Sequence, residues 1–470
     1  MSKLRLFIDN FLVFGVGGII SKLIPLIMVP IVTRIMPSTD YYGISELSNT
    51  IVQFGSAFAV MGIYDAMYRM FFDNDDVKYK KSVCSTALVF TICTSVIVFI
   101  IMLFFKNVIA QYFFNDKKYF YVVYLSAIGT LVGATNSIVS APTRMQNKRK
   151  VFLIINTISP LLAYLIALPM LFAGYYVVAL PLAILISGTL MEISFGVLNK
   201  KWFNPKLFDF NLLKQLLVIA VPLLPNFLIY WVFNSCDKVM ITNMLGIDAA
   251  GIYSVGSKIG QISQLIYIAF AGGWQYFAFS TMNDDNQVLS NSKIFEYLGT
   301  ISFVFSGFIC AWSYIIFLFL FKVDYISGYI VAPYLFLAPL LQMLFQVASN
   351  QFLVVKKTWP ILFILSLGAS VNIIFNIYFI PKLGIEGAAI ATLIGYVVSD
   401  IICVIVLQRM QLILISRRFF VVSFIMCLFI ISWRFFFCDS ILLGTGAAII
   451  FTFFMMFLYR IELKMIISLI

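Results

Sequence analysis

Long uninterrupted apolar segments are the feature of this chain that most restricts its fold. Each is about 20 residues long, which is the length that one helix needs to cross a bilayer. They follow one another along a chain of 470 residues that is 62% hydrophobic and 11% charged. A soluble core cannot bury that much apolar surface, and a transmembrane β-barrel would show short alternating segments instead. We therefore expect an all-α polytopic membrane protein.

About fourteen transmembrane helices fit into a chain of this length with short loops. The predicted spans are 11–36, 43–64, 83–105, 119–140, 151–172, 177–198, 214–241, 249–271, 297–321, 328–350, 359–380, 385–407, 419–437 and 441–459. No small-residue cleavage site follows the first apolar run, so we expect that run to be a span and not a removed signal peptide.

Basic residues are distributed unevenly between the predicted loops. With the N-terminus placed in the cytoplasm, Lys and Arg are nearly three times as frequent in the inner loops and termini as at the outer side. This bias predicts that both termini are cytoplasmic. It also accounts for the net charge of +12 without a nucleic-acid partner. Lys238 and Arg434 are among the few charges assigned to the outer side.

The residue content of the chain excludes several classes of chemistry. It has no His, which removes the usual neutral-pH base and the commonest metal ligand. Its Cys residues form no C-x-x-C pair, and no phosphate-binding loop of the ATPase type occurs. The loops are too short for a soluble catalytic domain. We expect no catalytic residues, no metal and no cofactor.

A short motif recurs in three predicted outer loops. Residues 245–252 match residues 383–390 without a gap, and residues 36–44 repeat the pattern more weakly with one insertion. Each copy joins an odd-numbered span to the next even-numbered one. Equivalent hairpins indicate duplicated halves, which are common in secondary transporters.

Polar side chains recur at helical spacing inside four predicted spans. At these spacings each set lies on one helix face. Because a polar face cannot contact lipid, it must face other helices or water. We favour a hydrated cavity for the seventh and eighth spans and interhelical hydrogen bonds for the tenth. The sets are Glu46, Asn49, Gln53 and Ser56; Asn226, Tyr230, Asn234 and Asp237; Ser254, Lys258 and Gln261; and Gln342, Gln346 and Asn350.

Two lysines lie well inside predicted spans. Lys22 is near the middle of the first span, roughly 15–20 Å from either interface, so it cannot extend its ammonium group to water. Lys258 lies inside the eighth span in the same way. A mid-membrane ammonium costs at least about 2.5–3.5 kcal/mol unless water, an anion or a carboxylate compensates it. The alternative to cavity lining is a structural ion pair with Glu46, Asp65 or Asp237.

Several segments of the chain resemble Wzx-type polysaccharide flippases. They include the opening hairpin with Lys22, Pro25 and Tyr42-Gly43, and the stretches 208–214, 222–225, 234–238, 245–253 and 380–392. The similarity extends over most of residues 1–410 and includes no catalytic signature.

The resemblance implies the fold of the multidrug/oligosaccharidyl-lipid/polysaccharide exporter superfamily. That fold has two pseudo-symmetric six-helix lobes, here residues 1–205 and 206–410, with helices 1, 2, 7 and 8 around a central cavity. Residues 411–470 would add accessory helices 13 and 14, as in the fourteen-helix members. The implied substrate is an oligosaccharide on undecaprenyl pyrophosphate, flipped across the bacterial cytoplasmic membrane by alternating access.

A flippase for this substrate needs a cationic cavity for the pyrophosphate and hydrogen-bonding groups for the sugars. Membrane lipids surround it, and a polysaccharide polymerase is a candidate partner. Lys22 and Lys258 would supply the charge. The predicted hydrogen-bonding residues are Glu46, Asn49, Gln53, Asn226, Tyr230, Asn234 and Gln261.

Three other functions were weighed against the flippase. An ion-coupled multidrug or cation antiporter of the same fold is disfavoured by the two lysines but kept open by Asp237. A lipid II flippase differs only in the sugar headgroup. A membrane-embedded enzyme would need a sizeable outer loop with catalytic residues, which the chain lacks. The candidate proton or sodium sites are Asp65, Asp237 and Asp400.

Overall fold

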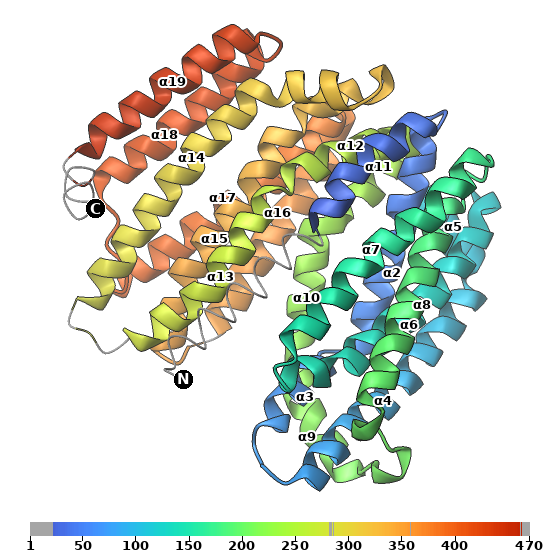
Figure 1. Cartoon of the computed structure of the whole chain (residues 1–470). Coiled ribbons are helices and arrows are strands. Elements are labelled where there is room, and N and C mark those ends of the chain that lie inside the picture. Colours follow the sequence, from blue (N-terminus) through green and yellow to red (C-terminus); the bar gives the residue numbers. More distant parts are fainter. Residues whose placement is uncertain (1–21, 282–283, 285, 358, 461, 463–470) are drawn as a thin grey trace. The chain divides into compact units, whose positions relative to one another are not determined.

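The computed structural model describes residues 22–281, 284, 286–357, 359–460 and 462, which form helices joined by short links. These helices belong to two compact units, the N-terminal unit Met1–Ser254 and the C-terminal unit Val255–Ile470 (Figure 1). The division after residue 205 that the resemblance implies stays a prediction.

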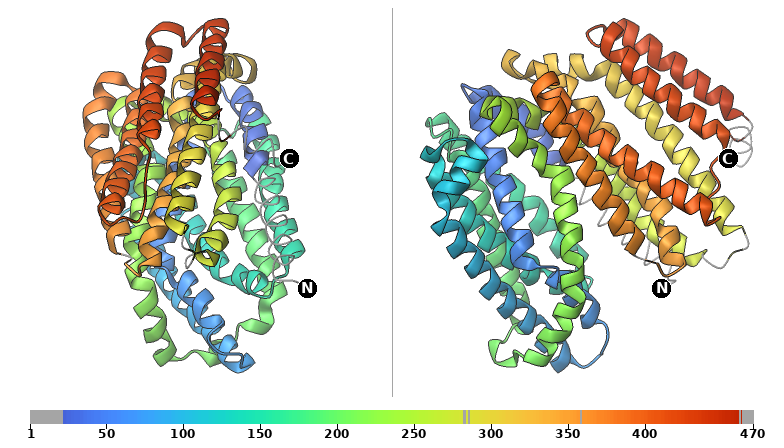
Figure 2. Two further views of the ribbon diagram at one scale, coloured as in Figure 1. Left: turned by 90° about the vertical axis from the view of Figure 1, so that its left-hand side faces the viewer. Right: turned by 180° about the vertical axis from the view of Figure 1, so that it is seen from behind.

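The N-terminal unit is a bundle in which α2, α4 and α8 each pack against α6, and α7 packs on α8 (Figures 1 and 2). Its first described helix spans 22–35. The others are α2 Thr39–Val60, α3 Ile63–Phe71, α4 Val77–Phe104, α5 Lys106–Phe114, α6 Phe120–Met145, α7 Arg149–Phe172, α8 Ala179–Asn199, α9 Phe210–Ala220, α10 Leu224–Trp231, α11 Asp237–Leu245 and α12 Ile247–Gly260, which continues into the second unit.

A bend of 49° separates α2 from α3, so the predicted second span ends early. Met61 and Gly62 both adopt left-handed backbone conformations, with φ of 49° and 76°. A Cβ atom at Gly62 would lie 2.6 Å from the carbonyl oxygen of Ala220 in α9. Only glycine combines this φ with so close a backbone approach, and the bend therefore has a local cause in the sequence.

The predicted seventh span is one continuous but irregular segment, Phe210–Leu245. Asp209 caps its start by accepting hydrogen bonds from the backbone N–H groups of Asn211 and Leu212. Pro222 and Pro225 have no N–H to donate, and the helix tightens to a 3₁₀ turn at Val221–Leu223. It widens to a π-helical turn at Val232–Cys236.

The C-terminal unit is built around α14 and α15. α14 packs against α15, α18 and α19, and α17 packs between α15 and α16. Its elements are α13 Ser263–Ser280, α14 Gln287–Leu320, a 3₁₀ helix Val323–Ile330, α15 Ala332–Val354, α16 Trp359–Leu383, α17 Ile385–Arg409, α18 Arg417–Ser432 with a π-helical turn Trp433–Phe437, and α19 Ile441–Leu458.

In the described part of the chain, eleven helices are long and apolar enough to span a membrane, and the bent pair α2 and α3 makes a twelfth. The predicted first span lies partly outside the described residues. The predicted eighth span is interrupted at Gln261 and Ile262, between α12 and α13. The prediction of an all-helical polytopic membrane protein is confirmed, and the number fourteen stays a prediction.

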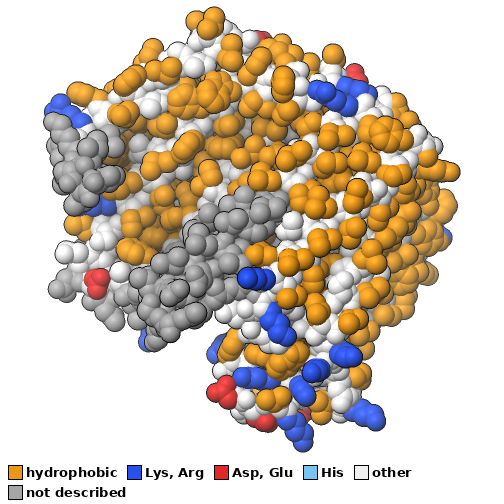
Figure 3. Space-filling model, in the orientation of Figure 1, with side chains coloured by type: hydrophobic (Ala, Val, Ile, Leu, Met, Phe, Trp, Pro, Cys, Tyr) orange, Lys and Arg blue, Asp and Glu red, His pale blue; other side chains and the backbone are white. Residues whose placement is uncertain are grey.

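The surface is apolar where the helices would meet lipid. Hydrophobic side chains cover most of the face shown in Figure 3, while Lys and Arg gather at the end of the N-terminal unit where α3, α4 and α9 meet. Exposed basic residues there include Arg69, Lys78 and Lys214. Polar side chains such as Ser48 and Ser126 instead pair inside the bundle, with their hydroxyl oxygens 2.9 Å apart. Apolar side chains outside and paired polar side chains inside are the distribution that a lipid bilayer requires.

Candidate functional site

The weak first copy of the repeated motif lies against the second copy. A Cβ atom at Gly251 would be 2.1 Å from the carbonyl oxygen of Thr39, and one at Gly43 would be 2.5 Å from that of Ile247. The Thr39 hydroxyl donates to Asp248 Oδ1 at 3.0 Å. The repeated glycines therefore let α2 and α12 begin in direct backbone contact.

A buried ion pair lies one turn further along α2. Lys238 Nζ of α11 is 2.7 Å from Glu46 Oε2, and the two side chains are only 8% and 10% exposed. The Tyr42 hydroxyl donates to Glu46 Oε1 at 3.2 Å. Glu46 therefore forms an ion pair with α11, and it also belongs to the polar set predicted for the second span. The sequence-based topology places Lys238 at the outer side and does not predict that it is buried.

The π-helical turn divides the set of polar residues that was predicted for one face of the seventh span. Before and within the turn, Asn226 is half-buried and Tyr230 and Asn234 are exposed. Beyond it, Asp237 is 3% exposed and accepts a hydrogen bond from the Tyr253 hydroxyl at 2.7 Å. A π turn holds an extra residue, so positions after it are rotated relative to a regular helix. That these four side chains share one face stays a prediction, and Asp237 differs from Tyr230 and Asn234 in being buried.

Asn49 and Gln53 differ in their surroundings on α2. Asn49 lines a cavity of about 130 Å³ between α2, α6 and α8, together with Ser45, Ser48 and Asn136. Gln53 is exposed. An exposed amide inside an apolar helix needs water or a polar ligand beside it, because lipid offers no hydrogen bond.

The two lysines of the predicted cationic cavity belong to different compact units. Lys22 is exposed at the start of the described chain. Lys258 is half-buried near the end of α12, and Gln261 is exposed at the break between α12 and α13. That both lysines serve one substrate site stays a prediction.

The three candidate coupling acids occupy different environments. Asp65 is exposed on α3, and Asp237 is buried beside Tyr253. Asp400 is buried in α17, and neither of its carboxylate oxygens has a hydrogen-bond partner among the described residues. Within the described ranges, no three Cys, Asp or Glu side chains are close enough to hold a metal ion.

A second buried glutamate lies in the C-terminal unit, in the third copy of the repeat. Glu386 Oε1 accepts hydrogen bonds from the Tyr334 hydroxyl at 2.9 Å and from Arg434 Nε at 2.6 Å. Sequence reasoning assigned Arg434 only to the outer side and did not single out Glu386. Both units thus contain a glutamate bound by one tyrosine and one basic side chain.

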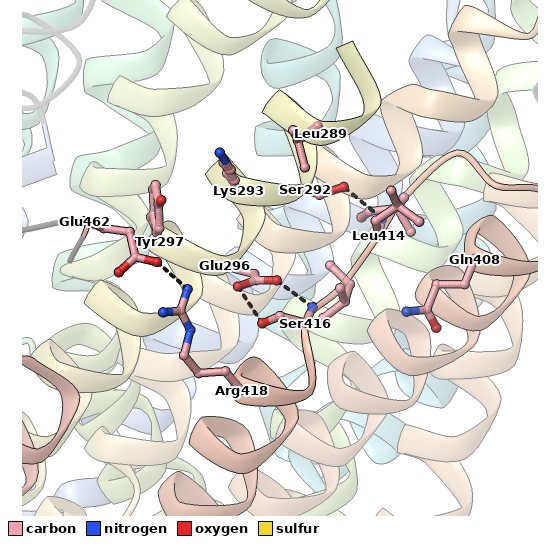
Figure 4. A pocket seen from close by; sticks show the side chains of 12 residues that line it. Leu289, Ser292, Lys293, Glu296, Tyr297, Gln408, Leu414, Ser416, Arg418 and Glu462 are labelled. Atoms are coloured by element: carbon pink, nitrogen blue, oxygen red, sulfur yellow. Dashed lines mark hydrogen bonds and ion pairs between the residues drawn. The ribbon is translucent and has the colours of Figure 1, made fainter. Parts of the chain in front are cut away.

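A polar cavity of about 430 Å³ lies where α14 begins, beside the link between α17 and α18 (Figure 4). Glu296 accepts hydrogen bonds from the N–H and the hydroxyl of Ser416, at 2.6 and 2.8 Å. Arg418 pairs with Glu462 at 2.7 Å, and this hydrogen bond lowers the pKa of the Glu462 carboxyl. The bonds from Ser416 to Glu296 hold the link against α14. The sequence-predicted site residues lie elsewhere.

Comparisons with known proteins agree on the architecture. A family model described as "Polysaccharide biosynthesis protein" matches residues 31–322. No curated protein matches the chain. A solved structure of the lipid II flippase MurJ in an inward closed conformation is similar with a TM-score of 0.72, at 14% identity, over 96% of this chain and 99% of that one.

An inward-facing multidrug resistance MATE family transporter of the MOP superfamily is also similar. Its TM-score is 0.64 at 15% identity, over 84% of this chain and 98% of that one. At these identities the two structures establish a shared fold.

Proposed function

The chain belongs to the polysaccharide biosynthesis protein family, and from this premise we propose that it flips undecaprenyl-pyrophosphate-linked oligosaccharide repeat units across the cytoplasmic membrane. The family match over residues 31–322 carries the proposal, and the fold shared with a flippase supports it. The family is one of transporters and not of enzymes. Transport would proceed by alternating access, with surface polysaccharide as the final product.

Lys22 and Lys258 would attract the pyrophosphate, and polar side chains on the helices would bind the sugars. The exposed amide of Gln53 supports this proposal, because lipid offers it no hydrogen bond. Asn234 is also exposed, and its Nδ2 donates to the Tyr230 carbonyl oxygen at 2.7 Å. The Glu46 carboxylate is already bound to Lys238. Glu46 would therefore affect sugar binding by holding the Lys238 side chain in position. The other proposed sugar contacts are Asn49, Asn226, Tyr230 and Gln261.

A lipid II flippase is the second candidate, favoured by the nearly complete coverage of the MurJ structure. The multidrug or cation antiporter is less well supported. Its best acidic residue, Asp237, is 3% exposed and already accepts a hydrogen bond from Tyr253.

Deleting the gene tests the proposal. We expect loss of surface polysaccharide and accumulation of lipid-linked repeat units in the inner leaflet, both reversed by the intact gene. Mass spectrometry of extracted lipids identifies what accumulates. Accumulation of lipid II with unchanged surface polysaccharide would instead favour the second candidate.

We also propose that both termini face the cytoplasm of a bacterial cell, on the strength of the loop charges. Single cysteines placed at residues 144–150, where α6 ends and α7 begins, should resist a membrane-impermeant maleimide in intact cells, and cysteines placed in 323–326 should react. Because native cysteines such as Cys93 and Cys427 are exposed, a Cys-free background is the appropriate parent. Reaction of 144–150 from outside would reverse the orientation.

A further inference from the structure

An apolar cavity of about 360 Å³ lies inside the C-terminal unit, between α14, α15, α17 and α18. This volume is within the range of small-molecule binding sites. Aromatic rings form much of its wall, among them Phe303 from α14 and Phe419 and Phe424 from α18. Leu341 of α15 and Val397 of α17 close other sides.

One carboxylate is part of this apolar wall. Asp400 is 8% exposed, and neither of its oxygens accepts a hydrogen bond from the described residues. The described part of the chain places no Lys or Arg in the cavity wall. The other polar lining groups are the hydroxyl of Ser423, which donates to the Phe419 carbonyl oxygen at 3.0 Å, and the thiol of Cys427.

The chemistry of the wall restricts what fits the cavity. A buried carboxyl without a partner takes up a proton unless an opposite charge stabilises its ionised form. A bare metal ion would need several oxygen ligands, whereas this wall offers only the Asp400 carboxylate and the Ser423 hydroxyl. The faces of aromatic rings attract organic cations, and the rest of the wall favours an apolar body.

We propose that this cavity binds an amphipathic organic cation, with its positive group against Asp400 and its apolar body among Phe303, Phe419 and Phe424. This site goes beyond the proposed function. It has the opposite charge from the one that a pyrophosphate requires. Most of its lining also lies beyond residues 31–322, the range that the family match covers.

Tetraphenylphosphonium and tetraphenylborate are suitable probes because they have nearly the same shape and opposite charge. The purified full chain in detergent should bind radiolabelled tetraphenylphosphonium in equilibrium dialysis. Asp400→Asn, which keeps the shape of the side chain, should weaken this binding about tenfold or more. Glu192→Gln in α8 removes one carboxylate from the other unit and should leave the binding unchanged. Tetraphenylborate pairs with the phosphonium in solution, so it is dialysed separately, and its binding should not depend on Asp400.

Unchanged phosphonium affinity in Asp400→Asn would overturn the proposal, as would a wild-type chain that does not bind the probe. If Asp400→Asn fails to elute as a monodisperse protein, Val397→Phe decides the matter. It narrows the cavity and keeps the carboxylate, so lost binding supports the proposal and unchanged binding overturns it. Neither result depends on polysaccharide export, so failure here is distinguishable from failure of the proposed function.

Discussion

Replacing Lys238 with Met is expected to remove most of the folded protein from the membrane. The substitution leaves Glu46 buried without its lysine partner, 2.7 Å away in the native chain. Removing one member of a buried ion pair costs about 3–5 kcal/mol, a large part of the roughly 5–15 kcal/mol that stabilises a typical protein. Abundance in the membrane and the melting temperature of the purified chain measure the effect.

Two further variants test whether the loss of stability comes from an unpaired charge that is buried. The double variant Glu46→Gln with Lys238→Met leaves no unpaired charge, so we expect it to recover much of the lost stability. Lys118→Met breaks a pair with Asp116 that has a similar length, 3.0 Å, but side chains that are 65% and 42% exposed. It should leave the melting temperature unchanged. A Lys238→Met protein that melts like the wild type would contradict a stabilising role for the buried pair.

The transmembrane helices were predictable because a single property, continuous hydropathy, decides whether a segment enters lipid. Where the helices bend or change pitch depends on single contacts. Gly62 bends the second segment because the backbone at Ala220 approaches it closely. The π-helical turn at Val232–Cys236 has no signature in residue spacing, and it rotates the positions that follow it relative to a regular helix.

The candidate site was predictable only as a set of polar positions. Helical spacing identified Glu46, but its partner Lys238 is 192 residues away in the sequence, and no local pattern joins them. One signal was available, since Lys238 lies inside the predicted span 214–241 with apolar residues directly after it. A charge in that position needs a buried partner.

The repeated motif indicates duplicated halves, and its residues also make specific contacts between helices. Its glycines permit the contact between α2 and α12, and its acidic residues accept hydrogen bonds. Asp248 binds Thr39, and Glu386 of the third copy binds Tyr334 and Arg434. The motif therefore marks helix starts that are joined to neighbouring helices, a role that the sequence alone did not specify.

Replacing Lys22 or Lys258 with Ala is expected to reduce polysaccharide export to background with normal protein abundance. Under the proposed function, each substitution would remove a positive charge that attracts the pyrophosphate of the substrate. An ammonium acts as a point charge, so Arg should keep partial export, whereas Glu should be more harmful than Ala. The measurement is surface polysaccharide, normalised to the amount of this protein in the membrane, in the deletion strain carrying each variant. Lys117→Ala removes the same charge from an exposed position and should export normally.

The competing explanation for both lysines is a structural ion pair, and it predicts a different pattern. In that case Lys22→Ala and Lys258→Ala would lower protein abundance, and exchanging the charges with Glu46 or Asp237 would restore it. Glu46 is already bound to Lys238 and Asp237 to Tyr253, so such rescue must compete with existing bonds. Normal abundance with normal export in both Ala variants would remove these lysines from the transport path. Normal abundance with lost export would place their charges on the path that the substrate follows.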